Sequence, residues 1–297
     1  MIAISGATGH LGRMTAQRVA ELGCDPGDLV LTTRTPDAVA ELVPGAQARV
    51  ADFGRPETLA SAFGGVRRLL LISTDTVDER SVQHAAAIDA AVAAGVEHII
   101  YTSMLSPAPP NPALIAESHW ATEEHLRASG VAYTILRCSL YSDFQVFEAA
   151  EALTSGRFVH NRGAGGCSYI ARSDCAAAAA AVLTGDGHEG QVYELTGPES
   201  LDADSLAALY SEFGDRSVES VSVGDDELLR VLAADAGTDG HVQYGATLAI
   251  SLGRAIREER FAAVTATVEQ LTGRAPRAVS ALLEESKNVM RSSVGGL

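Results

Sequence analysis

The sequence has few cysteines, and none of them has a spacing typical of a metal site. Its four cysteines, Cys24, Cys138, Cys167 and Cys175, form no C-x-x-C pair and no metal-type spacing with histidine, so we predict no bound metal. A chain of 297 residues can bury a sizeable core without disulfides. We therefore expect reduced, packed thiols in an intracellular, cytoplasmic protein.

Long apolar runs and blocks of basic residues are also missing. No stretch approaches the roughly 20 apolar residues that a membrane helix needs, and the segment from Met1 to Ser5 has no basic targeting region. The 22 basic residues are outnumbered by 38 acidic ones, which gives a formal net charge of −16. We therefore expect neither direct nucleic-acid binding nor a membrane partner, while a homodimer is left open.

Short apolar runs alternate with segments of helical period through the first half of the chain. This rhythm is typical of an α/β fold with a doubly wound parallel sheet, the Rossmann architecture. The run Leu69–Ile72 lacks polar alternation, which favours a central strand buried on both faces. The expected strands are Met1–Ser5, Leu29–Thr33, Ala48–Asp52, Arg68–Ser73, His98–Ser103 and Ala132–Arg137, and the expected helices are His10–Leu22, Pro36–Leu42, one starting at Pro56, Glu79–Ala94 and Ile115–Ser129.

The pattern after Arg137 is looser and mainly helical. We predict a dinucleotide-binding domain over residues 1–137 and a smaller, mainly helical substrate-binding lobe over residues 138–297. A returning strand completes the first domain. No low-complexity linker separates the two parts, so one compact unit is expected. The elements expected here are the returning strand Gln191–Leu195, a short strand at Val218–Val223, and helices at Phe144–Ser155 and Asp174–Leu183.

A glycine-rich loop joins the first expected strand to the first expected helix. Glycines at its positions allow a tight turn, close approach of the backbone to a pyrophosphate, and close helix–strand packing. The amino terminus of the helix then presents free N–H groups to the anion. We predict that the loop binds a dinucleotide through Gly6, Ala7, Thr8, Gly9, His10, Leu11 and Gly12.

The end of the second expected strand favours NADP(H) over NAD(H). A carboxylate at this place would bind the ribose hydroxyls of NAD and repel a 2′-phosphate. Here the strand ends in Thr32-Thr33-Arg34, and the Arg34 guanidinium suits a phosphate. We also expect Asp52 and Phe53, at the end of the third strand, to flank the adenine.

Several segments together resemble the NmrA-like branch of the atypical short-chain dehydrogenases, and most narrowly the bacterial NADPH-dependent quinone oxidoreductase 2 group. The likeness extends over nearly the whole chain. It implies further cofactor contacts at Ser73, Thr74, Asp75, Cys138, Ser139, Leu140, Tyr141, Ser142 and Asp143. The segments that carry it are the glycine loop, Leu69–Ser73, Tyr101–Ser103, Tyr133–Arg137 and Tyr193–Pro198.

The sequence departs from most short-chain dehydrogenases at one catalytic pair. Those enzymes use a Tyr-x-x-x-Lys pair in which the tyrosine transfers the proton that accompanies hydride. This chain has Ile115 and His119 at the two places. A quinone suffers least from the loss, because hydride addition gives an aromatic hydroquinone anion that water can protonate. We therefore predict direct hydride transfer from NADPH to a quinone-like acceptor.

Three residues are the candidates for contact with the acceptor. Ser103 would hydrogen-bond an acceptor oxygen, His119 would position the nicotinamide ribose or deliver a proton, and Tyr141 would line the pocket. Each has an alternative: Ser103 satisfies the backbone at a strand end, His119 pairs with Glu123 in a metal site, or Tyr141 only packs. Two other functions stay open, a non-catalytic NADP(H)-binding redox sensor and a pathway-specific reductase of an aromatic or polycyclic ketone.

Overall fold

The large part of the molecule is a seven-stranded sheet in which every neighbouring pair of strands is parallel. The computed structural model describes residues 1–236 and 240–288. The predicted doubly wound Rossmann sheet is confirmed. Its strands, in spatial order, are β3 (Gln47–Val50), β2 (Leu29–Thr33), β1 (Ile2–Ile4), β4 (Arg68–Leu71), β5 (His98–Met104), β6 (Ala132–Cys138) and β8 (Gln191–Leu195).

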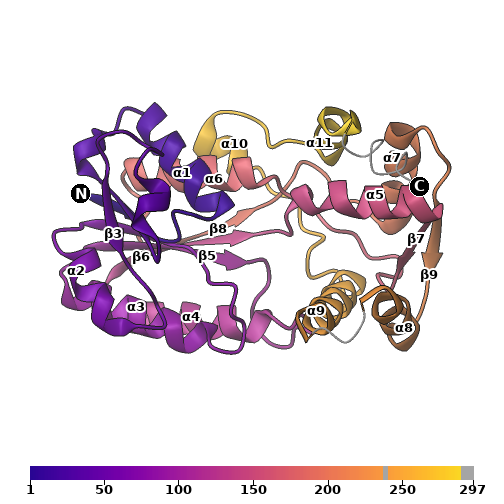
Figure 1. Cartoon of the computed structure of the whole chain (residues 1–297), viewed down its shortest axis with the longest axis horizontal. Helices are drawn as coiled ribbons and strands as arrows, with labels where there is room; N and C mark the ends of the chain where they lie inside the picture. Colours follow the sequence, from indigo (N-terminus) through magenta and orange to yellow (C-terminus); the bar gives the residue numbers. More distant parts are fainter. Residues whose placement is uncertain (237–239, 289–297) are drawn as a thin grey trace.

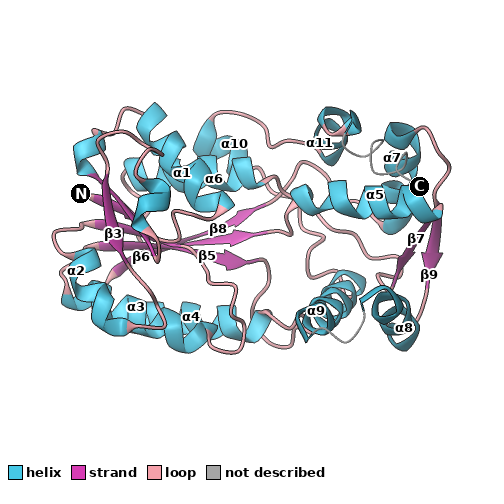
Figure 2. Cartoon of the chain, in the orientation of Figure 1, coloured by secondary structure: helices cyan, strands magenta, loops and turns pink. Residues whose placement is uncertain are grey.

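Helices cover both faces of this sheet (Figure 2). The apolar runs of β1, β4 and β5 are buried on both sides, as the absence of alternation in Leu69–Leu71 predicts. One face carries α1 (His10–Glu21), α6 (Arg172–Thr184) and α10 (Thr267–Thr272), and the other carries α2 (Leu59–Phe63), α3 (Arg80–Ala93) and α4 (Ala116–Ala128).

The smaller lobe lies beyond the carboxyl ends of β5, β6 and β8, which point toward it (Figure 1). It has its own core, which includes Leu206, Tyr210 and Phe261. A second, two-stranded parallel sheet pairs β7 (Arg157–His160) with β9 (Glu219–Ser222). The helices of this lobe are α5 (Gln145–Ser155), α7 (Ala203–Gly214), α8 (Asp225–Ala236), α9 (Gly240–Arg257) and α11 (Val279–Glu285).

Three features of the fold differ from the sequence-based expectations. The helix expected over Pro36–Leu42 is a 3₁₀ turn, Pro36–Val39, because Pro44 and Gly45 follow too soon for α-helical turns to form. Strand β7 was not expected, since its sequence has no period that separates it from a loop. Helix α6, which we assigned to the smaller lobe, packs against α1 in the Rossmann layer.

None of the described helices is both long and apolar enough to cross a membrane.

Candidate cofactor and substrate site

The glycine loop after β1 is folded tightly against the start of α1. Gly6 has a φ of +59°, the left-handed region that favours glycine, and the Gly9 N–H donates to the Gly6 carbonyl at 2.9 Å. A Cβ on Gly12 would lie 2.4 Å from that same carbonyl oxygen. Glycine at position 12 is therefore required for the close packing of helix on loop.

The amino terminus of α1 is free to bind an anion. Its N-cap, Gly9, provides no side-chain hydrogen bond, and no acidic residue lies in the first turn. The N–H groups of a first helical turn have no partner inside the helix, so a diphosphate would satisfy them. Arg13 donates to the Thr8 carbonyl at 3.0 Å, which fixes the loop from its far side. These residues fit the diphosphate of a dinucleotide.

Arg34 follows β2 directly and has an exposed side chain. Within the described part of the chain it forms no hydrogen bond or ion pair, unlike Arg13, which bonds the Ala38 carbonyl at 3.1 Å. Next to it, the Thr33 hydroxyl lies 3.1 Å from that of Thr8. An unpaired guanidinium at this strand end fits a 2′-phosphate, and the assignment stays a prediction.

Asp52 and Phe53 follow β3, the strand beside β2. One carboxylate oxygen of Asp52 accepts from the Gly54 N–H at 3.0 Å, which leaves the second oxygen available to a ligand. Phe53 is partly buried, and its ring meets that of His84 edge to face, with ring centroids 6.4 Å apart. Both residues lie at the sheet edge where we expect the adenine.

The backbone that follows β4 is held by neighbouring elements. The Ser73 N–H donates to the Thr102 hydroxyl and the Thr74 N–H to His84 Nε2, both at 3.0 Å. The Arg80 guanidinium donates to the Thr74 carbonyl at 2.8 Å. The expected cofactor segment Ser73–Asp75 is thereby fixed at the carboxyl edge of the sheet, with Asp75 exposed.

The segment that follows β6 is buried at its start and fixed at its end. Cys138, Ser139 and Ser142 are buried, whereas Leu140, Tyr141 and Asp143 are partly exposed. Asp143 accepts from the backbone N–H of Arg172 at 2.9 Å, and the Arg172 guanidinium stacks 4.7 Å from the centre of the Tyr141 ring. All six expected contacts lie beside β5 and β8, at the carboxyl edge.

Two buried imidazoles lie behind this edge. The Thr74 N–H donates to His84 Nε2, so Nδ1 carries the proton and donates to the Thr122 hydroxyl at 3.0 Å. Burial, together with the positive charge of Arg80, lowers the pKa of His84 to about 3 and the pKa of His119 well below its usual value. Both imidazoles are therefore neutral at neutral pH.

His119 is bonded to a tyrosine that the sequence-based reasoning did not single out as a site residue. Its Nδ1 lies 2.7 Å from the phenol oxygen of Tyr101, a fully buried side chain. Burial raises the pKa of Tyr101, so the phenol keeps its proton, and either group can be the donor of this bond. His119 is thus a neutral imidazole and not an acidic imidazolium.

Ser103 is engaged in a buried ion-pair cluster. Its hydroxyl donates to Glu123 at 2.7 Å, and the fully buried Glu123 carboxylate also accepts from Arg137 at 2.6 Å and Arg127 at 2.8 Å. Both carboxylate oxygens are occupied, so the alternative pairing of Glu123 with His119 does not occur. Within the described ranges, no group of three metal-ligating side chains comes together.

The sequence-based reasoning missed Arg80, His84 and Tyr101 as site residues. Arg80 and His84 lie four residues apart near the start of α3, so they share one helix face directly after the β4 edge. That spacing was the available signal. Tyr101 gives no such signal, because a tyrosine within an apolar strand is indistinguishable from core until its partner His119 is placed.

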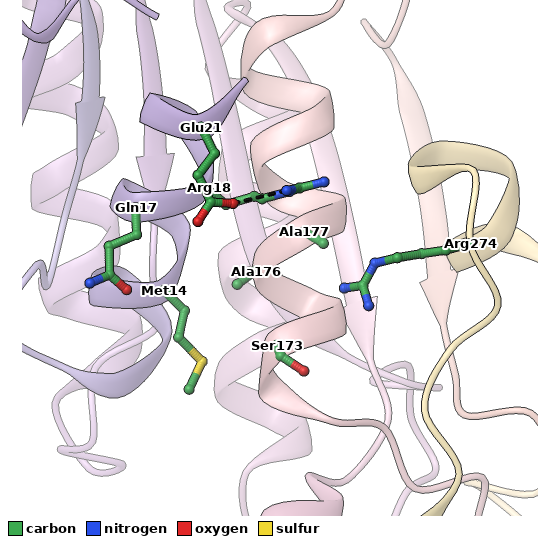
Figure 3. A pocket seen from close by; sticks show the side chains of 8 residues that line it. All are labelled: Met14, Gln17, Arg18, Glu21, Ser173, Ala176, Ala177 and Arg274. Carbon is green, nitrogen blue, oxygen red and sulfur yellow. Dashed lines mark hydrogen bonds and ion pairs between the residues drawn. The ribbon is translucent and has the colours of Figure 1, made fainter. Parts of the chain in front are cut away.

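A separate hollow of about 400 Å³ lies between α1, α6 and the segment that contains Arg274 (Figure 3). None of the expected cofactor or acceptor residues lines it. Its charged side chains are already paired, Arg18 with Glu21 at 2.9 Å and Arg274 with Asp174 at 3.1 Å. The lining residues are Met14, Gln17, Arg18, Glu21, Ser173, Ala176, Ala177 and Arg274.

Comparisons with known proteins agree with this geometry. Residues 6–186 match the model of a family described as NAD(P)H-binding. The chain is 38% identical over 241 residues to quinone oxidoreductase 2 of Escherichia coli (strain K12), covering 81% of this chain and 84% of that protein. The crystal structure of the NADPH-dependent quinone oxidoreductase of E. coli with NADPH has a TM-score of 0.90 and 33% identity, covering 96% of this chain and 99% of that chain.

A second solved structure is also similar over the whole fold. The triphenylmethane reductase of Citrobacter sp., complexed with NADP(H), has a TM-score of 0.85 and 31% identity, covering 96% of this chain and 99% of that chain. The two solved relatives are named for different acceptors. Similarity over the fold therefore does not by itself identify the acceptor of this chain.

Proposed function

The chain belongs to the NAD(P)H-binding family and is an NAD(P)H-dependent oxidoreductase; we propose that it transfers hydride from NADPH directly to a quinone or a similar electron-poor carbonyl acceptor, without a flavin. The observation that carries the choice of acceptor is the neutral His119, bonded to Tyr101, where a proton-donating pair would otherwise act. A site with no strong acid suits an acceptor that needs none.

A quinone meets this requirement because its reduced form is an aromatic hydroquinone anion. Water protonates such an anion readily, so orientation of the acceptor supplies much of the catalysis. An ordinary ketone, by contrast, gives an alkoxide that needs a proton as it forms. This chain has Ile115 and His119 where the tyrosine and lysine of other short-chain dehydrogenases supply that proton.

Different segments at the carboxyl edge of the sheet would bind different parts of the cofactor. The loop Gly6–Gly12 and the first turn of α1 would hold the diphosphate, Arg34 the 2′-phosphate, and Asp52 with Phe53 the adenine. The segments Ser73–Asp75 and Cys138–Asp143 would contact the nicotinamide half. When bound there, NADPH supplies the hydride.

The three candidate residues differ in which of their hydrogen-bonding atoms are available to the acceptor. We propose that His119 contacts the acceptor or the nicotinamide ribose through its Nε2 atom, and that the partly exposed Tyr141 lines the acceptor pocket. Ser103 already donates its proton to Glu123. Its role as a donor to an acceptor oxygen would require that bond to break, so His119 is the stronger candidate.

The test of this function is NADPH oxidation by the purified, flavin-free protein across a panel of benzoquinones and naphthoquinones. We expect turnover that requires no added flavin. Absence of turnover with every quinone, combined with equal binding of NADP⁺ and NADPH, would instead support the redox-sensor function. Turnover with polycyclic ketones but not with quinones would support the pathway-specific reductase.

The assignment of NADPH makes a separate prediction at Arg34. Replacing Arg34 with Ala removes a guanidinium that would form charge-assisted bonds to the 2′-phosphate, each contributing about 1.5–3 kcal/mol. We expect NADPH affinity to fall by roughly 10- to 100-fold in Arg34→Ala, with NADH affinity unchanged, as measured by titration calorimetry. Arg67→Ala is the matched control, since Arg67 is also exposed but pairs with Glu97 at the opposite edge of the sheet. Equal NADPH affinity in wild type and Arg34→Ala would refute the assignment.

A further inference from the structure

Arg80 is a buried cation without a carboxylate partner in the part of the chain that the structure describes. Its residue is 6% exposed, and among the arginines of the described chain it alone is buried to this degree. The other buried charge near the site, Glu123, is neutralised by both Arg127 and Arg137. No described carboxylate forms such an ion pair with Arg80, whose hydrogen bonds go to the Thr74 carbonyl and to the Ser118 hydroxyl at 3.2 Å.

Burial without a counter-charge is costly for a cation. The cost is visible as a lowered pKa of Arg80, caused first by burial and only partly offset by Tyr101, Tyr244 and Asp75. A guanidinium remains protonated under these conditions. The described protein groups around Arg80 therefore offset little of the desolvation cost of its charge.

The position of Arg80 ties it to the acceptor end of the site. It begins α3, after the loop 72–79 that follows β4, and its partners are Thr74, an expected cofactor residue, and Ser118, which precedes His119 on α4. From the smaller lobe, Tyr244 of α9 lies close enough for its pKa to respond to the Arg80 charge. Arg80 is thus located where α3, α4 and α9 meet beside His119.

We propose that the Arg80 guanidinium stabilises the negative charge that forms on the acceptor oxygen, so that the site selects neutral acceptors that become anions over cationic acceptors that become neutral. This inference rests on the proposed function and specifies its substrate class. A buried, preorganised cation is the kind of group that stabilises charge developing in a transition state. Nothing else described near His119 offers a full positive charge without a carboxylate beside it.

The chemistry balances without a protein acid. The quinone accepts a hydride from NADPH, which leaves as NADP⁺, and becomes a hydroquinone monoanion. Arg80 stabilises that oxyanion until it takes one proton from water and departs as hydroquinone. A cationic triphenylmethane dye accepts the same hydride but ends neutral, so Arg80 gives it no stabilisation and disfavours its approach.

The test compares Arg80→Gln with Arg80→Lys. Gln removes the charge but can still donate to the Thr74 carbonyl, whereas Lys keeps the charge. With a neutral benzoquinone, we expect kcat to fall about 100-fold in Arg80→Gln and less than 10-fold in Arg80→Lys. Reduction of a cationic triphenylmethane dye is expected to stay equal or to increase in Arg80→Gln. Arg67→Gln, at the opposite sheet edge, is the matched control.

A binding measurement makes the test independent of turnover. Pentachlorophenolate, a stable phenolate anion, is titrated into the NADP⁺-loaded wild type and variants by calorimetry. We expect at least a 10-fold loss of its affinity in Arg80→Gln and little loss in Ser118→Ala, which removes one anchor of the guanidinium but no charge.

The outcomes separate this inference from the proposed function. If wild type reduces quinones but Arg80→Gln loses quinone and dye reduction equally, or binds the phenolate as well as wild type does, Arg80 only anchors Thr74 and the inference is wrong. If wild type reduces no quinone at all, the proposed function fails first. Phenolate binding that depends on Arg80 would then still support an anion-stabilising site. Should Arg80→Gln fail to fold, Arg80→Lys and Arg80→Met are compared instead, because they also differ in whether the side chain is charged.

Discussion

At the scale of single residues, the candidate site combines neutral buried side chains with one buried positive charge, that of Arg80. His84 and His119 are buried, bonded on at least one ring nitrogen, and kept uncharged beside Arg80. Tyr101, also buried, keeps its proton. In the proposed site the acceptor would therefore meet neutral side chains and one fixed cation, none of which titrates between about pH 5 and pH 8. That arrangement suits electrostatic stabilisation better than proton transfer.

The two histidines predict acid-sensitive stability. Their pKa values are lower in the folded protein than the usual value of about 6.5 in the unfolded chain. Below that pH the unfolded chain binds protons that the folded state does not, so stability falls as the pH decreases. Each histidine contributes a slope of up to about 1.4 kcal/mol per pH unit, or roughly 2 kcal/mol between pH 6.5 and pH 5.

Urea unfolding of wild type and His84→Gln at pH 7.5, 6 and 5 measures this effect. We expect His84→Gln to be less stable at pH 7.5 but to lose clearly less stability on acidification than wild type does. His125→Gln is the control, because His125 is partly exposed and pairs with Asp89 at 2.8 Å. An identical pH slope in wild type and His84→Gln would contradict the neutral, buried His84.

At the scale of elements, the sequence was sufficient for the strands of the Rossmann sheet and insufficient for strand β7 of the smaller lobe. Strands such as β4 and β5 are apolar throughout because both faces are covered, and that pattern is local and readable. Strand β7 is not readable, because its pairing with β9 depends on a segment about sixty residues later in the chain. The strand ends at the expected cofactor site could be predicted because they follow from local sequence patterns. The bonds of His119 to Tyr101 and of Ser103 to Glu123 could not, because they join different elements of the fold.

The contact between the glycine loop and α1 predicts the effect of a single methyl group. In Gly12→Ala, the new Cβ would lie 2.4 Å from the Gly6 carbonyl oxygen and 2.9 Å from the Ala7 Cα, both backbone atoms that cannot rotate away. Either α1 or the loop must shift, at a cost of about 1–3 kcal/mol. We expect a lower Tm and a loss of NADPH affinity of at least 10-fold, by calorimetry.

Gly224→Ala is the matched control for that variant. Nothing lies within 4 Å of a Cβ built on Gly224, so the methyl group meets open space. Its Tm and NADPH affinity should match those of wild type. If Gly12→Ala also bound NADPH as wild type does, the close approach of α1 to the loop would not be needed for the diphosphate site.

At the scale of the whole molecule, the two parts are interleaved and not consecutive. The second half of the chain returns to the first layer three times: α6 packs against α1, β8 pairs with β6, and α10 packs on α6. Figure 1 shows these later, warmer-coloured segments lying against the early ones. The division at residue 137, which we predict from the change in pattern, stays a prediction for function, and it does not separate the chain into two independently packed parts.

This interleaving predicts that residues 1–137 do not fold alone. Without α6, the apolar face of α1 and one face of β1 and β4 lose their cover, since Val19, Ile4 and Leu70 share a core cluster with the alanines of α6. Without β8, β6 becomes an open edge strand, which invites aggregation. We expect the fragment 1–137 to show no cooperative urea transition and no NADPH binding, whereas mixing it with a 138–297 fragment restores part of both. A cooperative, NADPH-binding fragment 1–137 would show instead that the first six strands are stable without the returning elements.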